Sequence, residues 1–195
     1  MATVTALRQA RAGVLVELDG APWRTLPVDA VAAARLGVGC DLDRVTARAL
    51  ARALRHHRAE EAALRALARR EHSRASLDDR LARVGVSARD RREVVERAES
   101  AGLVDDARFA ERRAGQLAER GAGNLRVLDD LARHGVPEGI ARAATAALEP
   151  EPERAARVVE ARGASVRTVR YLASRGFSEE TLEPLIAEIE SRALG

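Results

Sequence analysis

Three segments of this 195-residue chain share the pattern Leu-Ala-x-x-Gly, followed by an apolar residue and then Ser or Pro. They are Leu81–Ser87, Leu131–Pro137 and Leu172–Ser178. Their glycines, at positions 85, 135 and 176, are 50 and 41 residues apart. A local pattern that recurs at such a spacing indicates tandem helical units.

The pattern describes the end of one helix and the start of the next. Its leucine, Leu81 in the first copy, belongs on the buried face of a helix. Its glycine suits the left-handed backbone that ends a helix, and the apolar residue that follows packs back on that end. Ser87 and Ser178 can then cap the next helix, while Pro137 suits a first helical turn. We therefore expect positive φ angles at Gly85, Gly135 and Gly176.

The helix before each motif also has a candidate N-cap, and another helix precedes that one. These caps are Ser73, Asn124 and Ser165. Each unit therefore consists of three helices. The expected helices span 59–72, 74–84 and 88–101, then 106–120, 125–134 and 138–148, then 153–162, 166–175 and 179–193.

The second unit begins with a hydrophobic-staple signature. With Asp105 as N-cap, Val104 precedes the cap and Phe109 is the fourth residue after it, so the two apolar side chains can pack together. We expect Phe109 to be buried between the first and second units.

The N-terminal stretch has strand periodicity instead. Val14, Val16 and Leu18 alternate with other residues, and Asp19-Gly20 leads into a second short extended run, which predicts a β-hairpin. Helices over 28–36 and 43–58, the latter capped by Asp41 or Asp43, can cover it. The expected fold is mostly α, with three three-helix units in an extended, curved array after a small hairpin-plus-helix region. The predicted boundaries are 1–58, 59–102, 103–149 and 150–195.

Composition supports helices and removes several kinds of chemistry. Only four residues are aromatic, so Leu, Val and Ala must build the core, which favours packed helices. All 33 basic residues are arginines, so lysine-dependent phosphate loops and Schiff bases are excluded. The single cysteine, Cys40, excludes an intrachain disulfide and any Cys-rich zinc site.

No catalytic or metal-binding pattern stands out. His56 and His57 are adjacent and point about 100° apart on a helix, and no nearby carboxylate pattern supports a metal ligand set. Paired acids such as Asp78-Asp79 and Asp129-Asp130 are typical of solvated faces. We expect a non-enzyme with no cofactor, no metal and no small-molecule substrate.

Signals for export or membrane insertion are also missing. The N-terminus has no apolar signal region, and no run approaches the ~20 apolar residues that span a bilayer. The expected location is the cytoplasm, without membrane contact.

Arginines cluster in places that suit phosphate. The net charge is +4 over 1–58, +1 over 59–104, and −1 in each of 105–149 and 150–195. Arginines at 65, 69, 70, 74, 80 and 83 can form a phosphate-binding face. The alternative is that arginines and acids pair on exposed helix surfaces.

Two blocks resemble the RecX family of regulatory proteins. Arg69-Arg70-Glu71-His72-Ser73-Arg74-Ala75-Ser76-Leu77, with the motif 81–87, is similar to its first signature. Gly102-Leu103-Val104-Asp105-Asp106-Ala107-Arg108-Phe109-Ala110 is similar to its second. The resemblance covers about residues 59–195, and 1–58 resembles the N-terminal extension of some members.

The resemblance implies a modulator of the RecA recombinase. RecX-like proteins lie in the groove of the RecA filament on single-stranded DNA, where they block strand exchange and ATP hydrolysis, and so affect recombination, DNA repair and the SOS response. The residues expected on the filament-facing surface are Arg65, Arg69, Arg70, Arg74, Arg108 and Arg112. The expected structural residues of the motifs are Ser73, Leu81, Gly85, Asp105, Phe109, Gly135 and Gly176.

Two other functions stay open at this point. One is a helical nucleic-acid-binding module that acts without RecA, and the other is a helical-repeat scaffold for a different protein. A direct DNA binder loses affinity for naked single strands steeply with salt and needs no partner, whereas a RecA modulator needs the filament.

Overall fold

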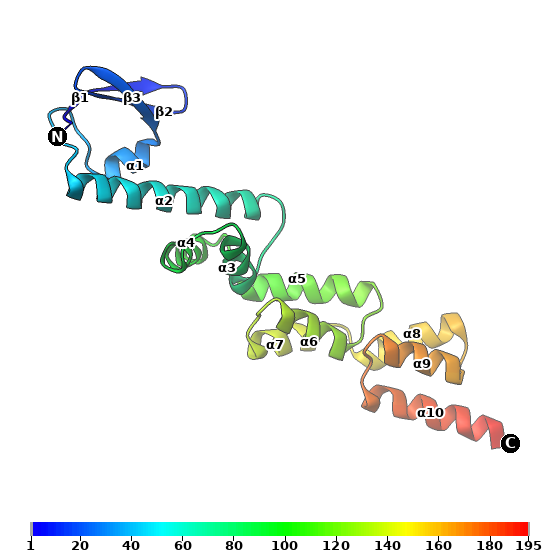
Figure 1. Cartoon of the computed structure of the whole chain (residues 1–195). Helices are drawn as coiled ribbons and strands as arrows, with labels where there is room; N and C mark the ends of the chain where they lie inside the picture. The colour runs from blue at the N-terminus through cyan, green and yellow to red at the C-terminus, as the bar shows by residue number, and fades with distance from the viewer. Residues whose placement is uncertain (1, 195) are drawn as a thin grey trace. The chain divides into compact units, whose positions relative to one another are not determined.

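The structure, a computed structural model, describes residues 2–194 (Figure 1). Residue contacts divide the chain into two compact units. One holds the chain up to Arg70 together with Asp78–Arg97, and the other holds Glu71–Leu77 and the chain from Ala98 onward. The predicted division into repeats is a different partition of the chain and stays a prediction.

The first unit begins with a three-stranded antiparallel sheet in the order β1-β2-β3. Its strands are β1 (Val4–Ala10), β2 (Gly13–Leu18) and β3 (Ala21–Leu26). The Asp19-Gly20 turn joins β2 to β3 with positive φ at both residues, as a tight hairpin requires. The expected hairpin is therefore present. The sequence pattern predicted two strands and missed β1. This strand contains Ala, Arg and Gln, which do not favour strands, and no turn signal precedes β2.

Helices α1 (Val28–Ala33) and α2 (Arg44–Leu67) follow the sheet. Val16 and Leu26 of the sheet share one core with Val31 and Leu50 of these helices. Asp43 caps α2 by accepting a hydrogen bond from the Thr46 amide at 2.7 Å.

The expectation of separate helices over 43–58 and 59–72 was wrong. Residues 44–67 form one helix, and no glycine or proline between them ends it. Helix α3 (Arg74–Arg83) and helix α4 (Ala88–Ser100) follow. Leu81 of α3 is fully buried, as the motif predicts.

Six further helices follow in the second unit (Figure 1). They are α5 (Asp106–Glu119), α6 (Asn124–Arg133), α7 (Glu138–Ala146), α8 (Glu151–Arg162), α9 (Val166–Ser174) and α10 (Glu179–Leu194). Helices α5–α7 share one core, and α8–α10 share another. The mostly helical fold in three-helix groups after a small sheet agrees with the expected fold class.

Phe109 is buried, at 7% exposure, in the core of α5–α7. Its ring lies 5.5 Å from the His134 ring. Asp105 caps α5 through a 3.0 Å hydrogen bond from the Arg108 amide, so the expected N-cap is confirmed. The expected position of Phe109 between the first and second three-helix repeats was wrong. The residues that form this core with Phe109 all come from α5, α6, α7 and their connections.

The Leu-Ala-x-x-Gly motif ends α3, α6 and α9 in the same way. Its glycines have φ angles of 81°, 68° and 83°, in chain order, so the expected positive φ is confirmed at all three. In each copy the amide after the glycine donates to the carbonyl of the motif leucine, at 3.1, 3.1 and 3.2 Å. This bond satisfies a carbonyl that the helix end leaves open.

The start of α3 contacts the end of α6. The Ser73 hydroxyl donates to the carbonyl of His134, the residue just before Gly135. The same hydroxyl accepts the Ser76 amide at 3.1 Å, so Ser73 is the expected cap as well as a link. Asp106, the first residue of α5, accepts the Arg74 amide at 2.7 Å.

The start of α6 contacts the end of α9 at the equivalent positions, through backbone amides. The Gly123 amide donates to the Arg175 carbonyl at 2.9 Å, and the Leu125 amide donates to the Gly176 carbonyl at 3.0 Å. Glu151, the first residue of α8, accepts the Asn124 amide at 2.5 Å. The two contacts therefore use the same positions of successive helix groups, and we call each of them a joint.

Asn124 is not the cap of α6, contrary to expectation. Gly123 occupies the cap position and has no side chain to accept a hydrogen bond. A Cβ at Gly123 would lie 2.2 Å from the Gly176 carbonyl oxygen, so the close approach at this joint excludes a larger residue. Caps at Ser165, Ser87 and Ser178 are confirmed.

Replacing Phe109 tests the core shared by α5, α6 and α7. We predict that Phe109→Ala lowers the free energy of unfolding by about 3–5 kcal/mol, because it leaves a cavity among α5–α7. Urea unfolding followed by circular dichroism measures the loss. Leu125→Ala is the control, because Leu125 is 56% exposed in the same helix group. Equal effects of the two substitutions would contradict the assigned core.

Gly85 and Gly135 both have left-handed backbone, but only Gly135 lies close to another residue, at the α3–α6 joint. Comparing alanine at the two positions therefore separates the cost of backbone strain from the cost of a steric clash. Alanine at Gly85 or Gly135 meets the cost of left-handed backbone, about 1–2 kcal/mol. A Cβ at Gly135 also lies 2.3 Å from the Ala75 Cβ, whereas at Gly85 it meets no atom within 4 Å. Gly135→Ala should therefore destabilise clearly more than Gly85→Ala in urea unfolding. Equal losses of unfolding free energy would contradict this, because they would mean that α3 and α6 move apart at the joint without cost.

Candidate functional site

The six arginines expected on the partner surface are all exposed. Three belong to the first unit: Arg65 lies on α2, and Arg69 and Arg70 follow its C-cap residue, Ala68. The other three belong to the second unit and are Arg74, Arg108 and Arg112. The structure therefore places the six in two sets, and their role as a site stays a prediction.

In the first set, Arg65 is paired with an acid, whereas Arg69 and Arg70 are not. Arg65 lies 3.4 Å from Glu61 on the same helix, a weak surface ion pair. Arg69 and Arg70 make no ion pair with any residue that the structure describes, and their amides bond back to the Ala66 carbonyl at 3.1 and 3.4 Å. Their backbone is thus held by the end of α2, while both guanidinium groups are available to an anion.

The second set is engaged with acids and carbonyls of its own unit. Arg74 pairs with Glu99, and Arg112 lies 2.6 Å from Glu71. The Arg108 guanidinium donates to the Gly102 carbonyl at 3.0 Å. An anionic partner must displace or share these contacts before it binds the three side chains.

The same unit also contains a partly buried ion pair that the sequence did not reveal. Arg113 of α5 donates two hydrogen bonds to Asp130 of α6, at 2.7 and 2.9 Å. The Arg113 hydrogen bond lowers the pKa of Asp130, and the pKa of Arg113 is raised by the same bond. The expectation of a solvated Asp129-Asp130 face was wrong for Asp130, which is buried.

Glu151 and Arg154 form a second buried polar group, at the α6–α9 joint. Besides the Asn124 amide, Glu151 accepts the Ser178 amide and hydroxyl and the Thr181 hydroxyl. Burial raises the pKa of Glu151, but these donors outweigh it and the pKa is lowered overall. Arg154 donates to the Ala122 carbonyl at 2.7 Å and to the Asn124 side chain.

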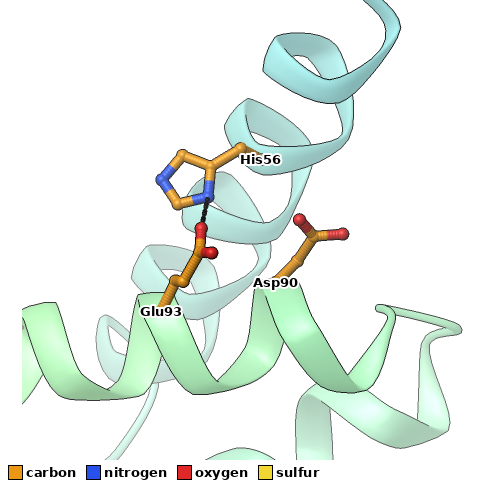
Figure 2. Close-up of side chains that lie close together, drawn as sticks. All are labelled: His56, Asp90 and Glu93. Atoms are coloured by element: carbon orange, nitrogen blue, oxygen red, sulfur yellow. Dashed lines mark ion pairs between the residues drawn. The ribbon is translucent and has the colours of Figure 1, made fainter. Parts of the chain in front are cut away.

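Among the described residues, one group of three side chains brings possible metal ligands together. It consists of His56, Asp90 and Glu93 in the first unit (Figure 2). None of the arginines discussed above takes part in this group.

Comparison with known proteins decides the family. A chain from Halorhodospira halophila described as "Regulatory protein RecX" is 35% identical over 137 residues, which is 65% of this chain and 85% of that one. The chain belongs to the RecX family. A RecX chain with the same description from Acidithiobacillus ferrooxidans is 34% identical over 136 residues, 64% of this chain and 85% of that one.

The RecX second three-helix domain matches residues 105–144, which cover α5, α6 and most of α7. The fold agrees as well. A crystal structure of regulatory protein RecX superimposes with a TM-score of 0.80 at 17% identity, covering 96% of this chain and all of that one. RecX from Lactobacillus salivarius gives 0.60 at 19% identity, covering 70% and 97%. Among the described residues, no helix is both long and apolar enough to span a membrane.

Substitution of the paired arginines should change stability little. We predict that Arg74→Ala and Arg112→Ala each change the free energy of unfolding by less than about 1 kcal/mol, because both ion pairs are solvent-exposed. Urea unfolding checks this. Arg113→Ala should cost clearly more, since it leaves the buried Asp130 carboxylate without its main partner. A large loss from Arg112→Ala would show that its pair with Glu71 is structural.

Proposed function

We propose that this protein binds the RecA filament on single-stranded DNA and inhibits both ATP hydrolysis and strand exchange. The observation that carries the proposal is the relationship to regulatory RecX proteins over 137 residues, including the α5–α7 domain. In this role it modulates recombination and DNA repair without catalysing a reaction itself.

The charge pattern supports an anionic partner at the first unit. Arg69 and Arg70 are adjacent, exposed and free of ion pairs among the described residues. Forming a contact there costs no existing ion pair, so these two arginines contribute more to binding than the paired Arg74 and Arg112. The filament offers both phosphates and acidic protein side chains as partners.

The repeated helix groups support a partner that is itself repetitive. The starts of α3 and α6 each bond to the end of a later middle helix at equivalent positions, so the same connection recurs along the chain. Several weak contacts to neighbouring RecA protomers then add up to useful affinity, because each later contact forms at high effective concentration.

A RecA ATPase assay on single-stranded DNA tests the proposal. The wild-type protein should suppress ATP hydrolysis and strand exchange at amounts no greater than equimolar with RecA. Arg69→Glu/Arg70→Glu should weaken inhibition at least about tenfold, because it reverses two cationic side chains at the contact surface. Circular dichroism and urea unfolding should show an unchanged fold.

A matched double reversal controls for net charge. Arg167 and Arg170 of α9 are also exposed, so Arg167→Glu/Arg170→Glu changes the charge by the same amount elsewhere. It should inhibit nearly as well as the wild type. Equal weakening by both double variants would overturn the choice of surface, and no inhibition by wild type would overturn the proposed function.

Co-sedimentation with preformed RecA filaments, compared with DNA alone, separates the alternatives. Binding that requires RecA supports the proposal. Equal binding to naked single strands, with a steep salt dependence, would instead indicate an independent nucleic-acid-binding module. Absence of binding to both would indicate a scaffold for another protein.

A further inference from the structure

In the first unit, a histidine of α2 faces two carboxylates of α4. His56 points toward Glu93, and Asp90 lies one turn earlier on α4 (Figure 2). One possible ligand atom from each residue lies within 4.8 Å of the other two. Asp90 and Glu93 are three residues apart, so both project from one face of their helix.

The imidazole of His56 has two buried nitrogen atoms without hydrogen-bond partners among the described residues. Both ring nitrogens are closed to solvent, and within the described part of the chain neither makes a hydrogen bond. Two carboxylate oxygens lie near them, Glu93 Oε2 at 3.7 Å from Nδ1 and Glu60 Oε1 at 3.3 Å from Nε2. A buried polar atom without a partner is costly, so an arrangement that satisfies both nitrogens is favoured.

We propose that His56, Asp90 and Glu93 form a zinc-binding site that links α2 to α4. Imidazole and carboxylate together suit Zn²⁺, and three protein ligands with water as the fourth form a common tetrahedral set. Ligand atoms about 2.0–2.1 Å from zinc lie about 3.3 Å apart in a tetrahedron, close to the 3.7 Å between His56 Nδ1 and Glu93 Oε2. Small side-chain rotations close the set.

Each of the two carboxylates has one oxygen that its existing contact does not use. Glu93 uses Oε1 to bind Arg89 at 3.0 Å, which leaves Oε2 toward His56. Asp90 uses Oδ2 to accept the Ser87 hydroxyl at 2.6 Å, which leaves Oδ1. Neither residue has to give up its existing contact to bind the metal.

Glu60 lies near the second ring nitrogen of His56, 3.3 Å from Nε2. When Nδ1 binds zinc, Nε2 carries the proton and can donate it to Glu60 Oε1. Metal-binding histidines commonly donate their second ring N–H to a carboxylate, which orients the ring and makes it a better ligand. Glu60 is itself held by an ion pair with Arg97 of α4.

Sequence spacing concealed this group. Asp90 and Glu93 follow His56 by 34 and 37 residues, and only the packing of α4 against α2 brings them together. The expectation of no metal ligand set considered only close neighbours along the chain. A bound ion would tie the two helices and stabilise the folded first unit, because ligands gathered by folding bind metal more tightly than an unfolded chain does.

Calorimetric titration of the full-length protein with ZnCl₂ at neutral pH tests the proposal. The wild type should bind one zinc ion, and saturating zinc should raise the thermal midpoint by roughly 5 °C or more. His56→Gln and Glu93→Gln should each weaken binding at least about tenfold and remove the thermal shift. Cobalt substitution should give visible absorption bands of a four- or five-coordinate nitrogen–oxygen site.

Neighbouring residues supply the controls. His57 is next to His56 and has its own carboxylate, Asp29, at 2.7 Å, so His57→Gln should leave zinc affinity within about twofold of wild type. Glu60→Gln should weaken binding, whereas Glu61→Gln should not. Absence of zinc binding, or binding that survives His56→Gln, would overturn the proposal. The second result would mark the metal as adventitious.

Discussion

The second unit depends on a close end-to-end contact between the middle helices of successive groups. The amides at the start of α3 and α6 are open hydrogen-bond donors, and the carbonyls at the end of α6 and α9 are open acceptors. At the α6–α9 joint the Gly123 and Leu125 amides donate directly to end carbonyls, whereas at the α3–α6 joint the Ser73 hydroxyl donates to the His134 carbonyl. Both joints bring opposite ends of helix dipoles together. Each joint is therefore held by hydrogen bonds between the start of one middle helix and the end of another.

Carboxylates stabilise each joint from the following group. Asp106 and Glu151 are the first residues of α5 and α8, and each accepts an amide at the start of the preceding middle helix. An acid at such a position is favoured by the positive end of the helix. At the second joint the carboxylate is buried, so further donors from Ser178 and Thr181 are needed to keep it charged. The order of the groups is thereby encoded in polar contacts as well as in apolar packing.

Features set by neighbouring residues were predictable from the sequence. The glycine helix ends, the Asp43, Asp105 and Ser165 caps and the Asp-Gly hairpin each depend on a few adjacent residues, and the structure confirms them. Features set by distant partners were not predictable. Gly123 replaces the expected Asn124 cap because the end of α9 approaches it, and Asp130 is buried because Arg113 reaches it from another helix. The same limit applies to the His56 group, whose members come from two helices.

The distribution of ion pairs separates arginines that hold the fold from those that are free for a partner. Arg113 and Arg154 make several hydrogen bonds each and lie partly or wholly inside the second unit, so their charge is committed to the fold. Arg74 and Arg112 form exposed pairs that add little stability and can exchange partners. Arg69 and Arg70 make no such pair among the described residues, although they lie only four and three residues before the joint residue Ser73. The block 69–77 therefore contains a structural residue, Ser73, beside exposed arginines for which we propose a binding role. Only substitutions that spare the joint can distinguish the two.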